Sequence, residues 1–202
     1  NYIDFGSNVL GDESNLSISF WINPSIVNDN DGVFTISTLS NSQSPLALFL
    51  HANNLRLYIN SAYAWQKNFS GELNVWTHVV ISYDGSDASN SKVYINGDED
   101  GGDGTYNFAT GNIDASGAGV KVAVGTYYNS AGYYLDGKMS NTQIWNTSLE
   151  QADVTTLYNN GVPLFSGTQP QAANLKAWWK MNVDTSEWNI PLGVSNAWQV
   201  GD

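Results

Sequence analysis

The chain has 202 residues, and its 7 Lys and Arg against 19 Asp and Glu give a formal net charge of −12 at pH 7. This length suits one all-β sandwich or barrel, so we expect a single domain over residues 1–202. The negative charge argues against nucleic acid and anionic lipid as partners. Because the chain has no Cys, it can form neither a disulfide scaffold nor a thiol nucleophile. No apolar run approaches the roughly 20 residues that a membrane-spanning helix needs, so we expect no membrane insertion.

Apolar residues that alternate with other residues predict a series of half-buried strands. The clearest example is 16–22, and more continuously apolar stretches at 33–39 and 46–50 predict strands covered on both sides. The same alternation recurs in residues 55–59, 79–83, 93–95, 120–124 and 175–181. Turn-forming pairs separate neighbouring strands, at Asn60-Ser61, Asp84-Gly85 and Asn96-Gly97. Many strands spaced by turns favour an all-β sandwich.

One segment breaks this pattern and predicts a short surface helix. Ser148 is suited to the N-cap, Gln151 occupies the capping-box position, and Gly161 provides a C-terminal stop. The apolar face that should dock on a sheet consists of Leu149, Ala152, Leu157 and Tyr158. Residues 182–202 have no period and are interpreted as a loop or tail, pinned to the body by Trp188 and Trp198.

Five segments of the sequence carry distinctive motifs. They are residues 2–6 (YIDFG), 16–24 (LSISFWINP), 76–85 (WTHVVISYDG), 93–97 (VYING) and 137–146 (GKMSNTQIWN), the last followed by the predicted helix. In this order they are similar to the laminin-G-like and pentraxin-like branch of the concanavalin A-like lectin/glucanase superfamily. The resemblance implies a jelly-roll sandwich of two antiparallel sheets with one short surface helix. The chain departs from the family at Ser140-Asn141, where an acidic pair is common, and at Thr142, where Val is common.

The last predicted strand is relevant to whether this chain is one module of a longer protein. Residues 175–182 resemble the strand with which many modules of this family begin, and the chain starts at Asn1 rather than at a Met. We therefore expect a module of a longer protein, with tandem modules as one form of it. The alternative is that this strand simply closes the sandwich.

Candidate metal ligands come partly from the resemblance and partly from the acids. The resemblance to pentraxins implies calcium on loops corresponding to residues 40–45 and 126–133, but these loops contain no acid, and neutral oxygens alone compensate a divalent cation weakly. Two other segments gather carboxylates and are the candidate calcium sites: Asp29 with Asp31, and Asp98, Asp100 with Asp103. The alternative interpretations are an acidic turn for the first and, for the second, a solvated acidic edge that prevents strand aggregation.

Aromatic and amide side chains provide the candidate ligand-binding residues. Tyr63 and Trp65 lie between predicted strands, and Tyr127, Tyr128 and Asn129 lie in the loop before Gly137. Aromatic rings stack on the C–H faces of sugars and amides bind their hydroxyls, so these residues could form a sugar-binding rim together with Tyr133 and Tyr134. The alternative is that the rings fill the core or shield a sheet edge.

The sequence favours a binding function over catalysis. A glycosidase needs two carboxylates that face the sugar. The chain lacks the Glu-x-Asp-x-x-Glu motif of laminarinase-like relatives. The only histidines are His51 and His78, both interpreted as structural. We expect a non-catalytic carbohydrate-binding or adhesion module that recognises surface glycans outside the cell, with calcium as the candidate cofactor. The alternative is a structural, decoration or receptor-binding component of a virion or surface assembly that binds protein and self-associates.

Overall fold

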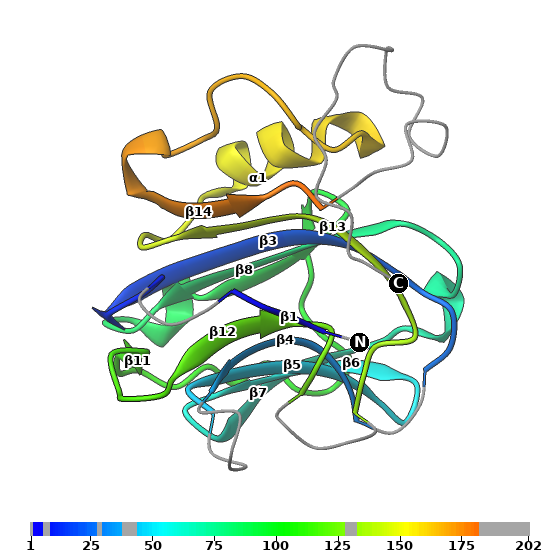
Figure 1. Ribbon diagram of the computed structural model, residues 1–202, viewed down its shortest axis with the longest axis horizontal. Helices are drawn as coiled ribbons and strands as arrows, with labels where there is room; N and C mark the ends of the chain where they lie inside the picture. Colours follow the sequence, from blue (N-terminus) through cyan, green and yellow to red (C-terminus); the bar gives the residue numbers. More distant parts are fainter. Residues whose placement is uncertain (1, 6–8, 28–29, 38–43, 128–132, 182–202) are drawn as a thin grey trace.

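The computed structural model describes residues 2–5, 9–27, 30–37, 44–127 and 133–181. Figure 1 shows two layers of strands that face each other, with the helix α1 (Gln151–Tyr158) lying on the outer side of one layer. All strand pairs in both layers are antiparallel. The predicted two-sheet jelly-roll sandwich with one short surface helix is therefore confirmed.

Each layer is a six-stranded sheet whose order differs from the order along the chain. The first sheet, in spatial order, consists of β1 (Ile3–Asp4), β12 (Lys121–Val124), β4 (Asp31–Ser37), β5 (Leu46–His51), β6 (Asn54–Ile59) and β7 (Ala62–Asn68). The second consists of β10 (Asp98–Glu99), β9 (Lys92–Ile95), β8 (Thr77–Asp84), β3 (Asn15–Pro24), β13 (Gly137–Trp145) and β14 (Leu175–Trp179). A small third pair joins β11 (Ile113–Asp114) to β2 (Asp12–Glu13).

Short 3-10 helices and tight turns connect the strands. The 3-10 helices are Ser70–Glu72, Ala88–Asn90, Asn159–Gly161 and Ala172–Asn174. Asn60 and Ser61, between β6 and β7, both have positive φ, which matches a two-residue hairpin turn. Asn96 and Gly97 form the same kind of turn between β9 and β10. Asp84-Gly85 differs, because Asp84 ends β8 and a 3-10 helix intervenes before β9.

The core between the sheets comes from the alternating strands. Phe20 and Ile22 of β3 pack in one buried cluster with Leu48 of β5 and Leu57 of β6. Every residue of β4 and the first five residues of β5 are buried, as their apolar stretches predict. Apolar burial of this extent is the main favourable contribution to folding.

The helix packs on the outer side of the second sheet, but its boundary and face differ from those predicted. Its N-cap is Glu150, which forms a capping box with Asp153. The Ser148 hydroxyl instead donates to the Tyr83 carbonyl at 2.9 Å. Val154 is buried and Ala152 is exposed, so the docking face is shifted along the helix. A second buried cluster fills this contact: Val80, Tyr94, Trp145, Leu149, Val154 and Leu157.

The end of the chain is described only in part. The last strand, β14, ends at Trp179 and pairs with β13 at the edge of the second sheet. The predicted tail over 182–202, with Trp188 and Trp198, lies outside the described residues. None of the helices in the described ranges is long and apolar enough to cross a bilayer.

Candidate functional site

The outward face of β5, β6 and β7 carries a group of aromatic and polar side chains. Leu55, Leu57 and Ile59 of β6 point into the core, so the intervening Arg56 and Tyr58 point to the other side of the sheet. The register places Phe49 of β5 opposite Arg56, and Tyr63 of β7 opposite Tyr58. The helix α1 covers the other sheet and leaves this face free of helix (Figure 1).

Four rings form a continuous strip on this face, which we call the aromatic strip: Tyr127, Phe49, Tyr58 and Tyr63. The ring centroids of successive members are 4.4, 5.5 and 5.1 Å apart, so each ring contacts the next. Phe49 is only 5% exposed and forms the base of the strip. Tyr58, Tyr63 and Tyr127 are half-buried, so part of each ring meets solvent.

Polar groups flank the aromatic strip. The Arg56 guanidinium carbon lies 5.8 Å from the centroid of the Tyr63 ring, within cation–π range. The Tyr63 hydroxyl donates to Oε1 of Gln66, whose Nε2 donates to the Asp103 carbonyl at 2.8 Å. In β5, two residues beyond Phe49, His51 Nδ1 is 3.1 Å from Oδ1 of Asn30. Such groups can bind hydroxyls or anions beside a stacked ring.

Tyr127 is positioned by close backbone contact with β4. The Gly32 amide donates to the Tyr133 carbonyl at 3.2 Å, and the Tyr127 amide donates to the same carbonyl at 3.3 Å. A Cβ atom at Gly32 would lie 1.7 Å from the Tyr127 nitrogen and 1.8 Å from the Thr126 carbonyl carbon. Only glycine therefore allows the segment that carries Tyr127 to approach β4 this closely.

Two of the five predicted ligand-binding residues, Tyr63 and Tyr127, lie in the aromatic strip. Trp65 is 0% exposed and packs in the core, so its ring faces the interior. Tyr128 and Asn129 lie outside the described residues. Of their neighbours, Tyr133 contacts Tyr127 edge-on with centroids 6.4 Å apart, and Tyr134 stacks on Tyr2 at 6.0 Å.

Sequence reasoning missed three members of this surface. They are Phe49, Arg56 and Tyr58. The neighbouring positions of the same strands form the core, and the sequence patterns identified only those core positions. The available signal was the alternation itself, because the residues between Leu55, Leu57 and Ile59 must face outward.

The described acids predicted as calcium ligands do not form a cluster that could hold a metal ion. Asp29 is outside the described residues, and Asp31 is buried at the start of β4. Asp98 is exposed in β10. Across the described ranges, no group of three or more His, Asp and Glu side chains is close enough together to hold a metal ion.

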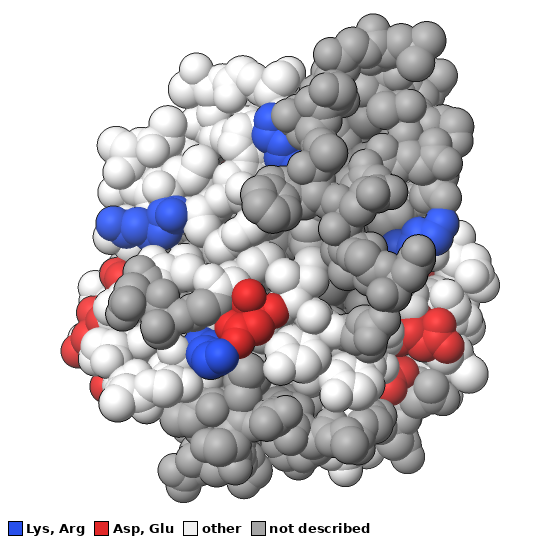
Figure 2. Space-filling model, in the orientation of Figure 1, with Lys and Arg blue, Asp and Glu red and all other residues white. Residues whose placement is uncertain are grey.

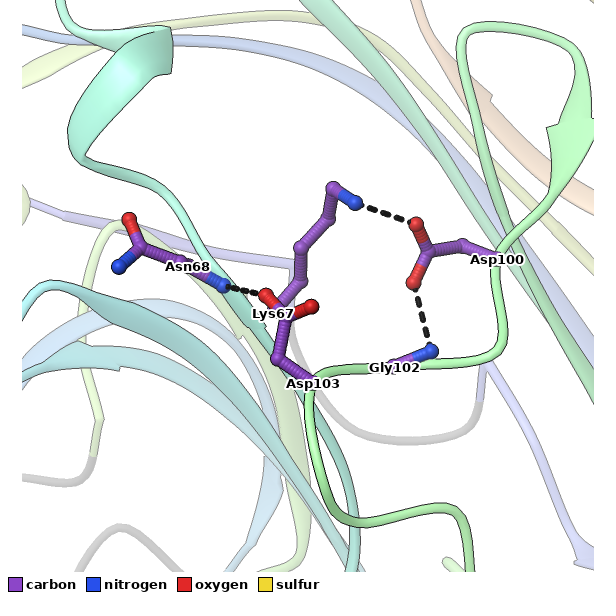
Figure 3. Close-up of polar contacts among 5 residues, drawn as sticks. All are labelled: Lys67, Asn68, Asp100, Gly102 and Asp103. Atoms are coloured by element: carbon purple, nitrogen blue, oxygen red, sulfur yellow. Dashed lines mark hydrogen bonds and ion pairs between the residues drawn. The ribbon is translucent and has the colours of Figure 1, made fainter.

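Asp100 and Asp103 hold their segment against β7 (Figure 3). Asp100 Oδ2 lies 2.5 Å from the Lys67 ammonium, and its Oδ1 accepts from the Gly102 amide at 2.8 Å. Asp103 Oδ2 accepts from the Asn68 amide at 2.6 Å. The hydrogen bond and charge of Asp100 raise the pKa of Lys67. These carboxylates therefore already have partners in the protein.

The same segment continues along the edge of β7. The Asp103 amide donates to the Gln66 carbonyl and the Asn107 amide to the Ala64 carbonyl, each at 2.7 Å. An isolated bridge also pairs Tyr106 with Trp65. Because these contacts use the outward backbone groups of β7, they cover the edge of the first sheet.

Acidic and basic side chains are interspersed on the face drawn in Figure 2. Three of the ion pairs in the described part of the chain join Lys67 to Asp100, Lys92 to Glu99, and Lys121 to Asp4. Isolated pairs of this kind differ from the clustered Lys and Arg of a nucleic-acid surface.

Comparisons with known proteins agree with this architecture. Residues 1–155 match the family model of the concanavalin A-like lectin/glucanases superfamily. A comparison with curated protein sequences gives no match. Among solved structures, the heptameric SAP-like pentraxin from Limulus polyphemus is similar with a TM-score of 0.58 and 22% identity, over 78% of this chain and 75% of the pentraxin chain.

Two further structures are similar. A protein from Bacteroides ovatus, provisionally described as carbohydrate binding, has a TM-score of 0.62 and 18% identity, over 89% of this chain and 48% of that chain. The other is domain 4 of AbnA, an extracellular arabinanase from Geobacillus stearothermophilus, solved with arabinotriose. It has a TM-score of 0.54 and 23% identity, over 75% of this chain and 70% of that chain. Because the family model matches more than half of the residues, the chain belongs to the concanavalin A-like lectin/glucanases superfamily.

Proposed function

We propose that the protein is a non-catalytic carbohydrate-binding module that acts outside the cell, and that the aromatic strip is its sugar-binding surface. The observation that carries this proposal is the stack of Tyr127, Phe49, Tyr58 and Tyr63 on a sheet face that α1 leaves uncovered. Half-buried rings on a rigid sheet offer flat apolar surface to the C–H faces of sugar rings. The neighbouring Gln66 and Arg56 supply donors for hydroxyls.

The similar structures support a saccharide ligand. The Bacteroides ovatus protein is described as carbohydrate binding, and the arabinanase domain was solved with arabinotriose. The second of these is one domain of an extracellular enzyme, and we propose a similar modular arrangement for this chain. The pentraxin is heptameric, so self-association is worth measuring alongside binding.

A binding role fits the residues of the surface better than glycoside hydrolysis does. Hydrolysis requires two carboxyl groups about 5–10 Å apart across the scissile bond. The aromatic strip and its flanking Arg56, Gln66, His51 and Asn30 include no Asp or Glu. A reducing-sugar assay with the saccharides that bind should therefore give no release above the blank.

The test is a glycan-array screen of the 202-residue chain, followed by titration calorimetry with the strongest ligand. Tyr58→Ala should weaken binding by about tenfold or more, because it removes the central exposed ring of the strip. Tyr58→Phe keeps the ring and should bind like the wild type. Val75→Ala, which changes an exposed apolar side chain on another part of the surface, is the remote control.

A blank array, or hits that Tyr58→Ala leaves unchanged, would overturn the proposal and favour the alternative of a structural component of a surface assembly. Size-exclusion chromatography with light scattering would then measure self-association directly. Calcium assistance stays a prediction. It is tested by running the same array with millimolar calcium and with a chelator.

A further inference from the structure

Arg56 occupies the centre of the candidate sugar-binding surface. It is the only arginine in the chain. The register places it between Phe49 of β5 and Gln66 of β7, with Tyr58 next but one along its own strand. Any ligand that stacks on the aromatic strip therefore lies beside this guanidinium.

The guanidinium has no acidic partner among the residues that the structure describes. Within the described ranges it makes no ion pair and no hydrogen bond, and its guanidinium carbon lies 5.8 Å from the centroid of the Tyr63 ring. Its Nε is buried without a hydrogen-bond partner. A buried donor that lacks a partner costs free energy, so the protein keeps this arginine in place at some expense of stability.

Arg56 contrasts with three of the lysines of this acidic protein. Lys67, Lys92 and Lys121 each pair with a carboxylate. With a formal net charge of −12, acids are abundant in the chain, yet none of those described contacts the single arginine. Among the described residues, Arg56 is thus a cation without an acidic partner that lies beside the stacked aromatic rings.

We propose that the ligand is an acidic saccharide whose carboxylate or sulfate binds Arg56. This inference rests on the proposed function and specifies its ligand class. The planar guanidinium presents donors in a fork that matches the paired oxygens of a carboxylate or sulfate group. The aromatic strip then stacks on the sugar ring that carries the anion, and on its neighbour.

An acidic peptide is the competing anionic ligand, and the structure favours the saccharide. An extended peptide commonly binds to a β-sheet by adding a strand at an open edge. The nearest edge, that of β7, is covered by the contacts of Asp103 with Gln66 and Asn107 with Ala64. The groups beside Arg56 are the stacked, partly buried rings of Phe49, Tyr58 and Tyr63.

The experiment compares neutral, uronic-acid and sulfated saccharides on one glycan array. The strongest acidic hit and its neutral counterpart, carboxyl-reduced or desulfated, are then titrated calorimetrically into the wild type and two variants. Arg56→Gln removes the charge and keeps a side chain of similar reach, whereas Arg56→Lys keeps the charge and loses the fork. Thermal unfolding of each variant checks that the sandwich is intact.

We expect the wild type to bind the acidic ligand at least about tenfold more tightly than its neutral counterpart. Arg56→Gln should abolish this difference in affinity. Arg56→Lys, which keeps the charge, should retain only part of it. Loss with the carboxyl-reduced or the desulfated ligand identifies which anion is bound.

Three results would overturn the inference. Neutral hits that depend on Tyr58 but not on Arg56 would leave the proposed function standing and refute the acidic ligand. A blank array would refute both. Binding of a polyglutamate peptide, in the absence of any acidic saccharide hit, would assign Arg56 to a peptide ligand instead.

Discussion

The Lys67 ammonium lies 2.5 Å from a carboxylate oxygen of Asp100, and this ion pair ties the segment after β10 to the strand β7 of the opposite sheet (Figure 3). Asp103 reinforces the connection by accepting from the Asn68 amide. The acidic segment that contains Asp100 and Asp103 therefore connects the two sheets at the edge formed by β7.

Lys67→Met tests this connection, because it keeps an apolar stem and removes the charge. We expect a loss of about 1–2 kcal/mol in the free energy of unfolding, since the half-buried Asp100 carboxylate loses its cation. Urea denaturation at pH 7 measures it. Because the pKa of Lys67 is raised, its stabilisation is present below its usual value of 10.5 and is lost as the pH rises through the higher folded value.

Lys92→Met is the matched control for this prediction. Lys92 pairs with Glu99 at 2.9 Å, but the side chains are 32% and 48% exposed. Solvent screens such a pair, so we expect a loss below about 0.5 kcal/mol. Equal losses for the two variants would contradict the structural role given to Lys67.

The spacing of the apolar residues predicts most of the fold. The residue that caps the helix could not be predicted from the sequence. The alternation in β3 and β6 and the apolar runs of β4 and β5 lie where the sequence predicts them. Ser148 is a good N-cap by residue type, but its hydroxyl accepts from Asn15 Nδ2 and donates to the Tyr83 carbonyl. Those partners are distant in sequence, so local capping rules could not identify them.

The candidate site was predictable only in part, for a reason that Tyr63 and Trp65 make clear. Two residues apart on a regular strand, they should share one face. A register shift between Leu57 and Tyr58 inserts Ala64 as an extra residue in β7, so that Tyr63 faces outward and Trp65 enters the core. Which strand carries a bulge depends on pairing across the sheet, which one sequence does not reveal.

Gly32→Ala tests how β4 positions Tyr127. The new Cβ would overlap backbone atoms of Thr126 and Tyr127, so one of the two segments must move. We expect a loss of about 2–4 kcal/mol in unfolding free energy. Saccharide binding should weaken as well, because Tyr127 leaves its contact with Phe49.

Gly101→Ala provides the control, since a Cβ at that glycine meets no atom within 4 Å. It should change stability by less than about 0.5 kcal/mol and leave binding unchanged. Calorimetry with the best array ligand and urea denaturation measure the two effects. Wild-type stability and affinity in Gly32→Ala would contradict the close approach of these segments.

Because His78 is buried, we expect the protein to lose stability in mild acid. His78 is 1% exposed, its Nε2 lies 2.9 Å from the Ser19 hydroxyl, and its Nδ1 has no hydrogen-bond partner. Burial lowers its pKa to about 3 from the usual 6.5, so the folded protein keeps the ring neutral where the unfolded chain binds a proton. Stability is therefore lost as the pH falls from about 6.5 towards 3.

Between pH 7 and pH 4.5 this difference amounts to about 2–3 kcal/mol. His78→Gln removes the titrating group, so the change in unfolding free energy between the two pH values should shrink by that amount, whatever the variant's stability at pH 7. Asp84, whose pKa is lowered to about 2 by hydrogen bonds from Ser86 and Asn90, acts mainly below this window. An identical pH dependence of the unfolding free energy in His78→Gln and in the wild type would contradict the lowered pKa of His78.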